Sequence, residues 1–335
     1  MADKRTCAYI FMSLQVSSSP HIRDNVTTRS IMRDVIIALV PAIIASGIIF
    51  GLRAVLMILV SVLSCLVFEY ISRRIMKRDN TLSDLTAVVT GILLAFNLPP
   101  TLPIYMVVIG AFFAIVVVKQ MFGGLGNNFV NPALTARIIL AIAFPNAMTN
   151  WSVLNGTFNF VHSISGVDLV SSATPLAILK SQGIQGAAEL PSYISLFLGD
   201  KAGCIGEVSI LALAIGVIYM LSRKVITLWI PLTYIGTVML ITGLVGKDPL
   251  YELLAGGLFL GAFFMATDYV TSPITRRGRI IFGIGCGLIT ALIRLYGNMA
   301  EGVSFAILLM NILTPHLDKY TAPKPFGEVK KHGKA

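Results

Sequence analysis

The stretch from Gly91 to Asn128 reads GILLAFNLPPTLPIYMVVIGAFFAIVVVKQMFGGLGNN. A short apolar run is followed by a polar turn with prolines, and then by a glycine-containing apolar segment that ends on the aromatic–glycine pair Phe122–Gly123. The stretch from Gly257 to Gly302, GLFLGAFFMATDYVTSPITRRGRIIFGIGCGLITALIRLYGNMAEG, follows the same order and reaches its own aromatic–glycine pair at Tyr296. This internal repeat predicts a chain built from two related halves.

The composition around these stretches is that of a membrane protein. The 335 residues are 56% hydrophobic and 13% charged, with a mean hydropathy of +0.82, whereas a soluble globular chain carries about 25% charged residues. A soluble enzyme, a disordered regulator and a nucleic-acid-binding protein are therefore excluded. The net charge of +10 has a different origin from that of a polyanion-binding protein, because the basic residues gather between and beside apolar runs.

About ten apolar runs approach the roughly 20 residues that a helix needs to cross a hydrocarbon core of about 30 Å. We therefore expect an all-α integral membrane protein. If five spans form one half, the two halves insert with opposite topology, which is the inverted-repeat arrangement of many transport folds. The expected spans are 35–52, 54–71, 85–98, 104–118, 133–148, 205–222, 225–244, 250–267, 279–295 and 301–315.

These spans divide the chain into a cytoplasmic N-terminal segment (1–34), a first transmembrane repeat (35–148), an extracytoplasmic segment (149–204), a second repeat (205–315) and a cytoplasmic tail (316–335). With both termini in the cytoplasm, all but five of the 26 Lys and Arg residues fall on the inner side of a bacterial inner membrane. The five on the outer side are Arg53, Lys180, Lys201, Lys247 and Arg294.

Two segments predict interrupted helices. The run Leu85–Leu98 gives about 21 Å of helix, which leaves roughly 9 Å of the core uncovered. The segment MFGGLGNNFVNPALTAR (121–137) is rich in glycine and asparagine, and irregular backbone is tolerated at membrane depth only inside protein or beside a polar cavity. It predicts a broken helix beside a cofactor or an ion pathway, with an ordinary cytoplasmic turn before the fifth span as the alternative.

Charged residues near the predicted span ends are expected to lie at the membrane interface, where snorkelling lowers their cost. This expectation weakens the case for a stand-alone ion pump. The residues concerned are Glu69, Asp84, Arg137, Glu252, Asp268, Arg294 and Glu301.

No local motif supports a catalytic or metal site within this chain. The four cysteines, Cys7, Cys65, Cys204 and Cys286, show no C-x-x-C spacing, so we interpret them as small hydrophobic fillers rather than iron–sulfur ligands. The four histidines are scattered, and the sequence has no P-loop, no G-x-G-x-x-G after a strand and no H-E-x-x-H.

The outward segment contains GVDLVSSATPLAILK (166–180). Thr174 precedes Pro175 and an apolar LAIL, which is how a helix with a hydroxyl N-cap and Pro at its first position begins. The free N–H groups and positive dipole end of such a helix would also stabilise a phosphate. From the residues alone, a simple cap and a phosphate-bearing hydroxyl both stay open.

The string from Asp168 to Thr174, DLVSSAT, resembles the flavinylation signature D-x-x-(S/T)-(G/S)-A-T, in which a separate flavin transferase esterifies FMN through its phosphate to the final threonine. Three further stretches, VSSSPHIRDNVTTRSIMRDVIIALVPA, SDLTAVVTGILLAFNLPPTLP and KQMFGGLGNNFVNPALTAR, resemble the RnfD family of the Rnf complex, the ion-translocating ferredoxin:NAD oxidoreductase. They are also similar to the related membrane subunit, NqrB, of the sodium-pumping NADH:quinone reductase. The resemblance runs from about Val16 to Pro315.

This resemblance implies that Thr174 carries covalent FMN. Because no base is evident that would activate Thr174 as a nucleophile, the threonine is a tether and the flavin supplies the redox chemistry. A second, noncovalent flavin such as riboflavin is a further expectation, with Asn97 and the segment Asn127–Asn131 as candidates for its site. Four residues become recognition residues for the transferase or neighbours of the flavin phosphate: Asp168, Ser171, Ser172 and Ala173.

The function that the resemblance implies is that of a flavin-carrying membrane subunit of a translocase. It would relay electrons between ferredoxin and NAD within the Rnf complex, coupled to Na+ or H+ translocation, with the other Rnf subunits, the flavin transferase and membrane lipid as partners. The alternatives are an inverted-repeat channel or secondary transporter without redox function, because a scaffold can host unrelated functions, and a scaffold subunit whose flavin site is vestigial.

Overall fold

The structure, a computed structural model, is helical apart from two three-residue strands, so the predicted all-α class is confirmed. It describes residues 26–154, 169–171, 174–182, 191–199, 201–207, 209–297 and 301–323.

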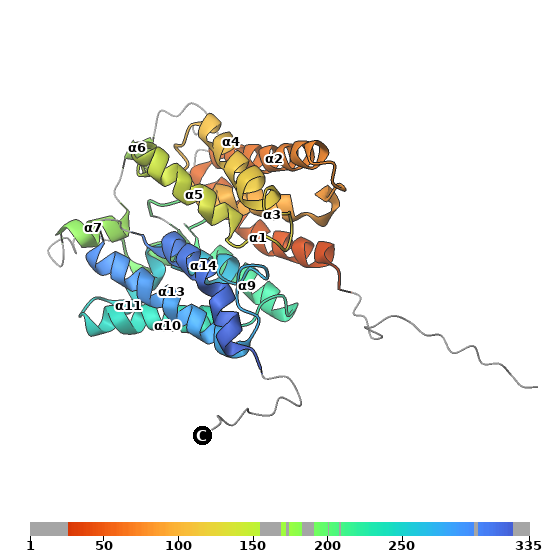
Figure 1. Cartoon of the computed structure of the whole chain (residues 1–335). Helices are drawn as coiled ribbons and strands as arrows, with labels where there is room; N and C mark the ends of the chain where they lie inside the picture. Colours follow the sequence, from red (N-terminus) through yellow and green to blue (C-terminus); the bar gives the residue numbers. More distant parts are fainter. Residues whose placement is uncertain are drawn as a thin grey trace, which may run out of the picture.

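The first half of the chain forms the upper part of the molecule in Figure 1. Its elements are α1 (Thr28–Phe50), α2 (Leu52–Ile75), the short 3-10 helix η1 (Leu82–Asp84), α3 (Thr86–Phe96), α4 (Ile104–Phe112) with its π-helical continuation η2 (Phe113–Gln120), α5 (Pro132–Ala143) and α6 (Pro145–Met148).

A connecting region and the second half follow. The connection contains β1 (Ser152–Leu154), which pairs antiparallel with β2 (Leu169–Ser171), and the helices α7 (Pro175–Gln182) and α8 (Tyr193–Leu198). The second half consists of α9 (Ile210–Ser222), α10 (Trp229–Leu244), α11 (Pro249–Leu254), α12 (Leu258–Leu260), the π-helical η5 (Gly261–Met265), α13 (Arg276–Tyr296) and α14 (Val303–Thr321).

Equivalent helices of the two halves pack in equivalent ways. The second helix contacts the fourth in each half, as α2 with α4 and α10 with α13, and the third contacts the fifth, as α3 with α5 and η5 with α14. Between the halves, α1 contacts α9 and α5 contacts α14. Each of these pairs joins a helix to its own counterpart, as expected for two repeats related by a pseudo-two-fold axis.

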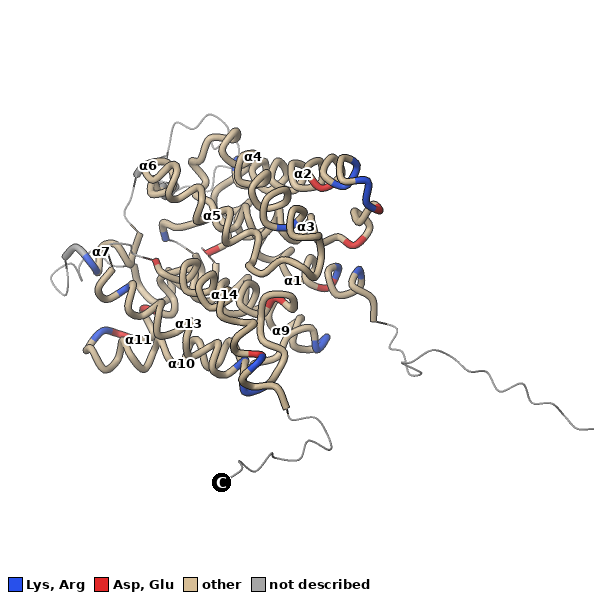
Figure 2. The backbone as a smooth tube through the Cα atoms, viewed as in Figure 1, with Lys and Arg blue, Asp and Glu red and all other residues tan. Residues whose placement is uncertain are grey.

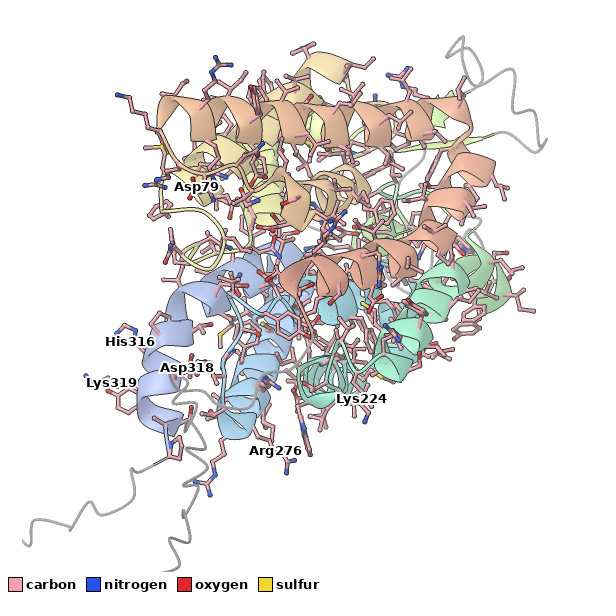
Figure 3. The ribbon with its side chains drawn as sticks, turned by 90° about the vertical axis from the view of Figure 1, so that its right-hand side faces the viewer. Asp79, Lys224, Arg276, His316, Asp318 and Lys319 are labelled. Carbon is pink, nitrogen blue, oxygen red and sulfur yellow. The ribbon has the colours of Figure 1, made fainter. Side chains whose placement is uncertain are left out.

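Three helices, α1, α2 and α13, are long and apolar enough to cross a membrane unaided, within the described part of the chain. Shorter apolar helices complete the bundle, and its outer surface exposes large apolar side chains along most helices. Figure 2 shows long stretches of helix without charge and a few charged residues inside the bundle. In Figure 3, Lys224, Arg276 and Lys319 project from the ends of helices in the lower part of the view. The protein is thus a multi-pass membrane protein.

The third element of each half is interrupted. Helix α3 ends at Phe96, as the short run 85–98 predicted, and the chain continues as a loop whose carbonyls at Pro100 and Thr101 accept hydrogen bonds from Arg53 at 2.8 and 3.0 Å. The run 250–267 was predicted as one span, which is wrong: the chain breaks between α11 and α12, at the pair Gly256–Gly257. Irregular backbone survives at this depth because it is buried in protein.

Two other boundaries differ from the expectation. Helix α1 begins at Thr28 rather than near residue 35, because Thr27 and Ser30 form a reciprocal capping box. The run 133–148 was predicted as one span but divides into α5 and α6 at Pro145, which has no N–H to continue the ladder of α5.

The glycine- and asparagine-rich segment forms the turn between η2 and α5. Gly123, Gly124 and Gly126 have φ angles of 119°, 94° and 89°, a region that side chains disfavour. Asn131 then caps α5, with its Oδ1 accepting from the N–H groups of Ala133 and Leu134 at 3.1 and 3.4 Å. The simple-turn alternative therefore describes the backbone, whereas the asparagines of this turn also line a pocket, as shown below.

Candidate functional site

Thr174 lies immediately before α7 and caps it. Its Oγ1 accepts a hydrogen bond from the N–H of Ala177 at 3.2 Å, and its carbonyl accepts from the N–H of Ile178 at 3.0 Å. The predicted N-cap with Pro175 at the first helical position is confirmed. The residue is only 4% exposed, so the hydroxyl is buried as well as engaged.

The remaining residues of the flavinylation signature are only partly within the described chain. Asp168, Ser172 and Ala173 lie outside the described residues. The backbone of Ser171 pairs with Ser152 at the end of the β1–β2 ladder. The ladder therefore leads the chain directly towards Thr174.

Helix α7 is fastened at both ends to the second half. Leu176, in its first turn, is buried in a small apolar cluster with Leu196 of α8 and Tyr251 and Leu254 of α11. Near its last turn, Lys180 donates to the carbonyl of Gly297, which ends α13. Helix α7 therefore lies across the ends of α11 and α13.

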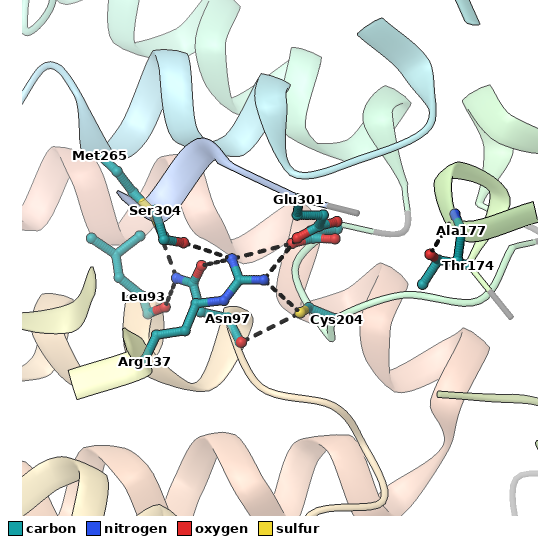
Figure 4. A network of polar contacts seen from close by, with 10 residues as sticks. Leu93, Asn97, Arg137, Thr174, Ala177, Cys204, Met265, Glu301 and Ser304 are labelled. Carbon is teal, nitrogen blue, oxygen red and sulfur yellow. Dashed lines mark hydrogen bonds and ion pairs between the residues drawn. The ribbon is translucent and has the colours of Figure 1, made fainter. Parts of the chain in front are cut away.

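Beside this region, six buried charged side chains gather between the two halves; we call them the interface cluster. Arg137 of α5 forms an ion pair with Glu301 at 2.7 Å and faces Glu207 at 3.6 Å. It also donates to Asn97 and Ser304 at 3.0 and 2.9 Å, and these contacts appear in Figure 4. The cluster consists of Arg137, Lys201, Glu207, Glu252, Arg294 and Glu301.

The other half of the interface cluster lies towards α11. Arg294, in the last turn of α13, donates through NH1 to the carboxylate of Glu252 at 3.0 Å and to its backbone carbonyl at 2.6 Å. Lys201 donates to the carbonyl of Leu254 at 2.5 Å. Three cations thus face three carboxylates, so the cluster is formally neutral.

Several polar atoms of this region are buried without a hydrogen-bond partner among the described residues. They are Glu207 Oε1, Tyr251 OH and both Nε and NH2 of Arg294. Buried polar atoms are normally satisfied, so these atoms mark a place where the chain alone does not complete its own hydrogen bonding.

A short backbone pairing holds the cluster in place. The N–H groups of Ile205 and Gly206 donate to the carbonyls of Leu98 and Phe96 at 3.1 and 2.9 Å, which satisfies the end of the broken helix α3. Cys204 donates to the carbonyl of Asn97 at 3.3 Å and lies 3.7 Å from Arg137.

The interpretation of the cysteines as fillers suits Cys65 and Cys286, which are buried in the main apolar core. It is incomplete for Cys204, whose thiol belongs to the polar network, and Cys7 lies outside the described residues. Within the described chain, no group of three His, Cys, Asp or Glu side chains could hold a metal ion.

The expectation that the charged residues near span ends snorkel to the interface is wrong for Glu69, Arg137, Glu252, Arg294 and Glu301. All five are paired inside the protein. Sequence reasoning also missed Lys201 and Glu207, whose only signal was a charge directly beside an apolar run.

A pocket opens on the side of the Gly/Asn turn and is lined by both halves. Apolar side chains, among them Phe263 and Phe264, form most of its wall, and Thr90, Asn128 and Asn131 add polar groups. Asn97, the other candidate for a second flavin, is not part of this lining; its side-chain amide donates to the carbonyl of Leu93 at 2.6 Å instead.

Comparison with known proteins adds to this geometry. Residues 15–327 match the model of the NQR2, RnfD, RnfE family. The chain is 47% identical over 328 residues to the RnfD-type protein of the Na(+)-translocating ferredoxin:NAD(+) oxidoreductase complex of Acetobacterium woodii, covering 97% of this chain and 99% of the relative. It is 44% identical to the corresponding protein of the proton-translocating ferredoxin:NAD(+) oxidoreductase complex of Clostridium ljungdahlii, covering 93% and 96%. It is 35% identical to that of the ion-translocating oxidoreductase complex of Shigella dysenteriae serotype 1, covering 95% and 100%.

Proposed function

The chain belongs to the NQR2, RnfD, RnfE family, and from that premise we propose that it is the membrane subunit that carries FMN, esterified to Thr174, in an ion-translocating ferredoxin:NAD+ oxidoreductase complex. It relays electrons between ferredoxin and NAD, whose own sites lie on partner subunits, while the complex moves Na+ or H+ across the bacterial inner membrane. Both termini lie in the cytoplasm, and Thr174 lies on the outer side.

The observation that carries this proposal is the placement of the Thr174 hydroxyl at the start of α7, at the end of the DLVSSAT string. The N–H of Ala177 already points at Oγ1, and a helix N-terminus stabilises an attached phosphate through its free N–H groups and its dipole. The residues present therefore fit a phosphoryl tether. The flavin, when bound, supplies one- and two-electron chemistry that no side chain offers.

The burial of Thr174 adds a condition on assembly. A hydroxyl that is 4% exposed and engaged as a helix cap is closed to a transferase. The flavin is therefore transferred before α7 packs against α11 and α13, or while α7 is displaced from them.

We further propose that the pocket lined by Asn128 and Asn131 binds the second, noncovalent flavin. Ligand pockets are mostly apolar with a few polar groups that fix orientation, and this pocket combines Phe263 and Phe264 with two amide side chains. The Asn128 side chain donates to the carbonyl of Val130 at 3.2 Å, which holds the turn in shape beside the pocket.

The covalent flavin is tested by mass spectrometry and by in-gel fluorescence of the denatured chain, co-expressed with a flavin transferase. The peptide that contains Thr174 is expected to gain the mass of FMN minus water, and Thr174→Val abolishes the fluorescence. Ser192→Ala is the matched control, because Ser192 caps α8 in the same outward segment; it leaves the fluorescence unchanged.

An unmodified peptide from a flavin-competent host would overturn the proposal and favour a channel or secondary transporter. Fluorescence that persists in Thr174→Val would move the attachment elsewhere in the chain. Cysteine labelling from each side of the membrane tests the orientation, and a label at the α6–β1 junction that reacts only from the cytoplasm would contradict the outward placement of Thr174.

A further inference from the structure

Arg294 has one edge of its guanidinium occupied and the other open. Its NH1 binds both the carboxylate and the backbone carbonyl of Glu252. Its Nε and NH2 are buried and have no hydrogen-bond partner among the described residues, although the residue is only 3% exposed. Leaving buried donors of a charged group unpaired is costly, so a bound group that accepts from this edge would be strongly favoured.

The open edge faces the start of α7. A Cβ placed on Gly256 would lie 2.9 Å from Arg294 NH2 and 2.8 Å from Leu176 Cδ1. The guanidinium and the first turn of α7 therefore meet over the same glycine. Lys180, which joins the later part of α7 to the end of α13, keeps the two helices together.

The chemistry of the open edge selects an anion with paired oxygens. The Nε and NH2 groups of arginine form a planar fork that matches two oxygens of a phosphate or carboxylate. A carboxylate oxygen, Glu301 Oε1, lies 3.4 Å from the same point above Gly256, but Glu301 forms its ion pair with Arg137 and none with Arg294 among the described residues.

We propose that Arg294 binds the phosphate of the flavin carried on Thr174, through its Nε–NH2 edge. This inference rests on the proposed function and assigns one phosphate-binding residue to it. The α7 N-terminus and Arg294 then share the single negative charge of the phosphodiester, which would otherwise be buried without a cation. Glu252 acts as a positioning residue, because it holds NH1 and so turns the other edge towards α7.

The test is phosphorus-31 NMR of the full chain, loaded with flavin in its host and purified in a phosphorus-free detergent. The Thr174→Val protein identifies the phosphodiester resonance by its absence. In the loaded wild type, this resonance is expected to differ in chemical shift from that of the same protein after denaturation. In Arg294→Gln it moves to the denatured position, and in Arg294→Lys it lies between the two.

Removing Arg294 alone leaves Glu252 buried without its partner, which endangers folding. The double variant Glu252→Gln/Arg294→Gln removes both charges together and gives the same expected loss of shift in a folded chain. Arg279→Gln is the matched control: Arg279 lies at the opposite end of α13 and binds Pro273 and Thr227, so its loss leaves the resonance in place.

A wild-type resonance at the denatured position, or a double variant with the wild-type shift, would overturn the assignment to Arg294. Both outcomes leave the flavin on Thr174. A wild-type chain with neither flavin fluorescence nor a phosphodiester resonance instead contradicts the proposed function itself, so the two failures are distinguishable.

Discussion

Two groups of buried charges in this protein are equally dry but differ in how completely they are satisfied. In the first half, Lys119 donates to both carboxylate oxygens of Glu69 at 3.0 and 2.9 Å and to Thr86 at 2.8 Å. Glu69 also accepts from Thr81 and Gln120 at 2.8 and 3.2 Å. In the interface cluster, by contrast, Glu207 and Arg294 keep buried atoms without partners among the described residues.

The difference separates a structural ion pair from a place that can take up a ligand. An ammonium has three donors, and Lys119 uses all of them within the first half. Arg294 uses NH1 alone. Burial by itself therefore does not identify the functional group; the count of unsatisfied donors does.

The largest effect is expected from breaking the complete pair. Glu69→Gln leaves Lys119 buried without its counter-charge and is expected to lower the free energy of unfolding by about 3–5 kcal/mol. Denaturant or thermal unfolding of the detergent-solubilised chain measures it. The double variant Glu69→Gln/Lys119→Met removes both charges and recovers most of the loss. A single variant as stable as the wild type would show that water reaches this pair.

A smaller effect is expected at the centre of the interface cluster. Arg137→Lys keeps the positive charge near Glu301 but cannot reach Asn97, Ser304 and Glu301 together, because a lysine lacks the planar fork. The expected loss is about 2 kcal/mol, at roughly 1 kcal/mol for each hydrogen bond that is not remade. The same unfolding measurement tests it, and a loss as large as that of Glu69→Gln would mean that the two groups of charges are equally structural.

The sequence predicted those features that depend on neighbouring residues. The short third span, the two halves with five spans each and the cap at Thr174 all follow from local spacing, and they match α3, the paired contacts of the repeats and the hydrogen bond to Ala177. The N-cap is a contact between residues three positions apart, so the local sequence contains all of it.

The interface cluster could not be predicted in this way. Arg137 and Glu301 are separated by 164 positions in the sequence, and their meeting requires both halves to be folded. Charges near predicted span ends resembled interfacial residues because an unbroken helix ends at the membrane surface. Where a helix is broken, as at Phe96 and between α11 and α12, its end lies inside the protein, and the charges beside it are buried.

A comparison of two glycines tests how closely the first half is packed. A Cβ on Gly91 of α3 would lie 2.7 Å from the backbone Cα of Val62 in α2, so Gly91→Ala must push the two helices apart and is expected to cost about 1–3 kcal/mol. Gly236 of α10 has open space around it, and Gly236→Ala is expected to stabilise the chain by up to about 1 kcal/mol through helix propensity. Equal effects of the two substitutions on the unfolding midpoint would contradict the close α2–α3 contact.

The smallest effect is expected at α7 itself, in protein made without a flavin transferase. Thr174→Val removes the hydroxyl that accepts from Ala177, and losing an N-cap costs about 1 kcal/mol, which corresponds to roughly fivefold faster local opening. Hydrogen–deuterium exchange of the peptide that contains α7 measures this change, and Ser192→Ala gives the same loss at α8 while leaving α7 unchanged. Unaltered exchange in Thr174→Val would show that the hydroxyl does not cap the helix in solution. The flavin-free chain would then present Thr174 to the transferase with α7 in place, because no cap would have to open first.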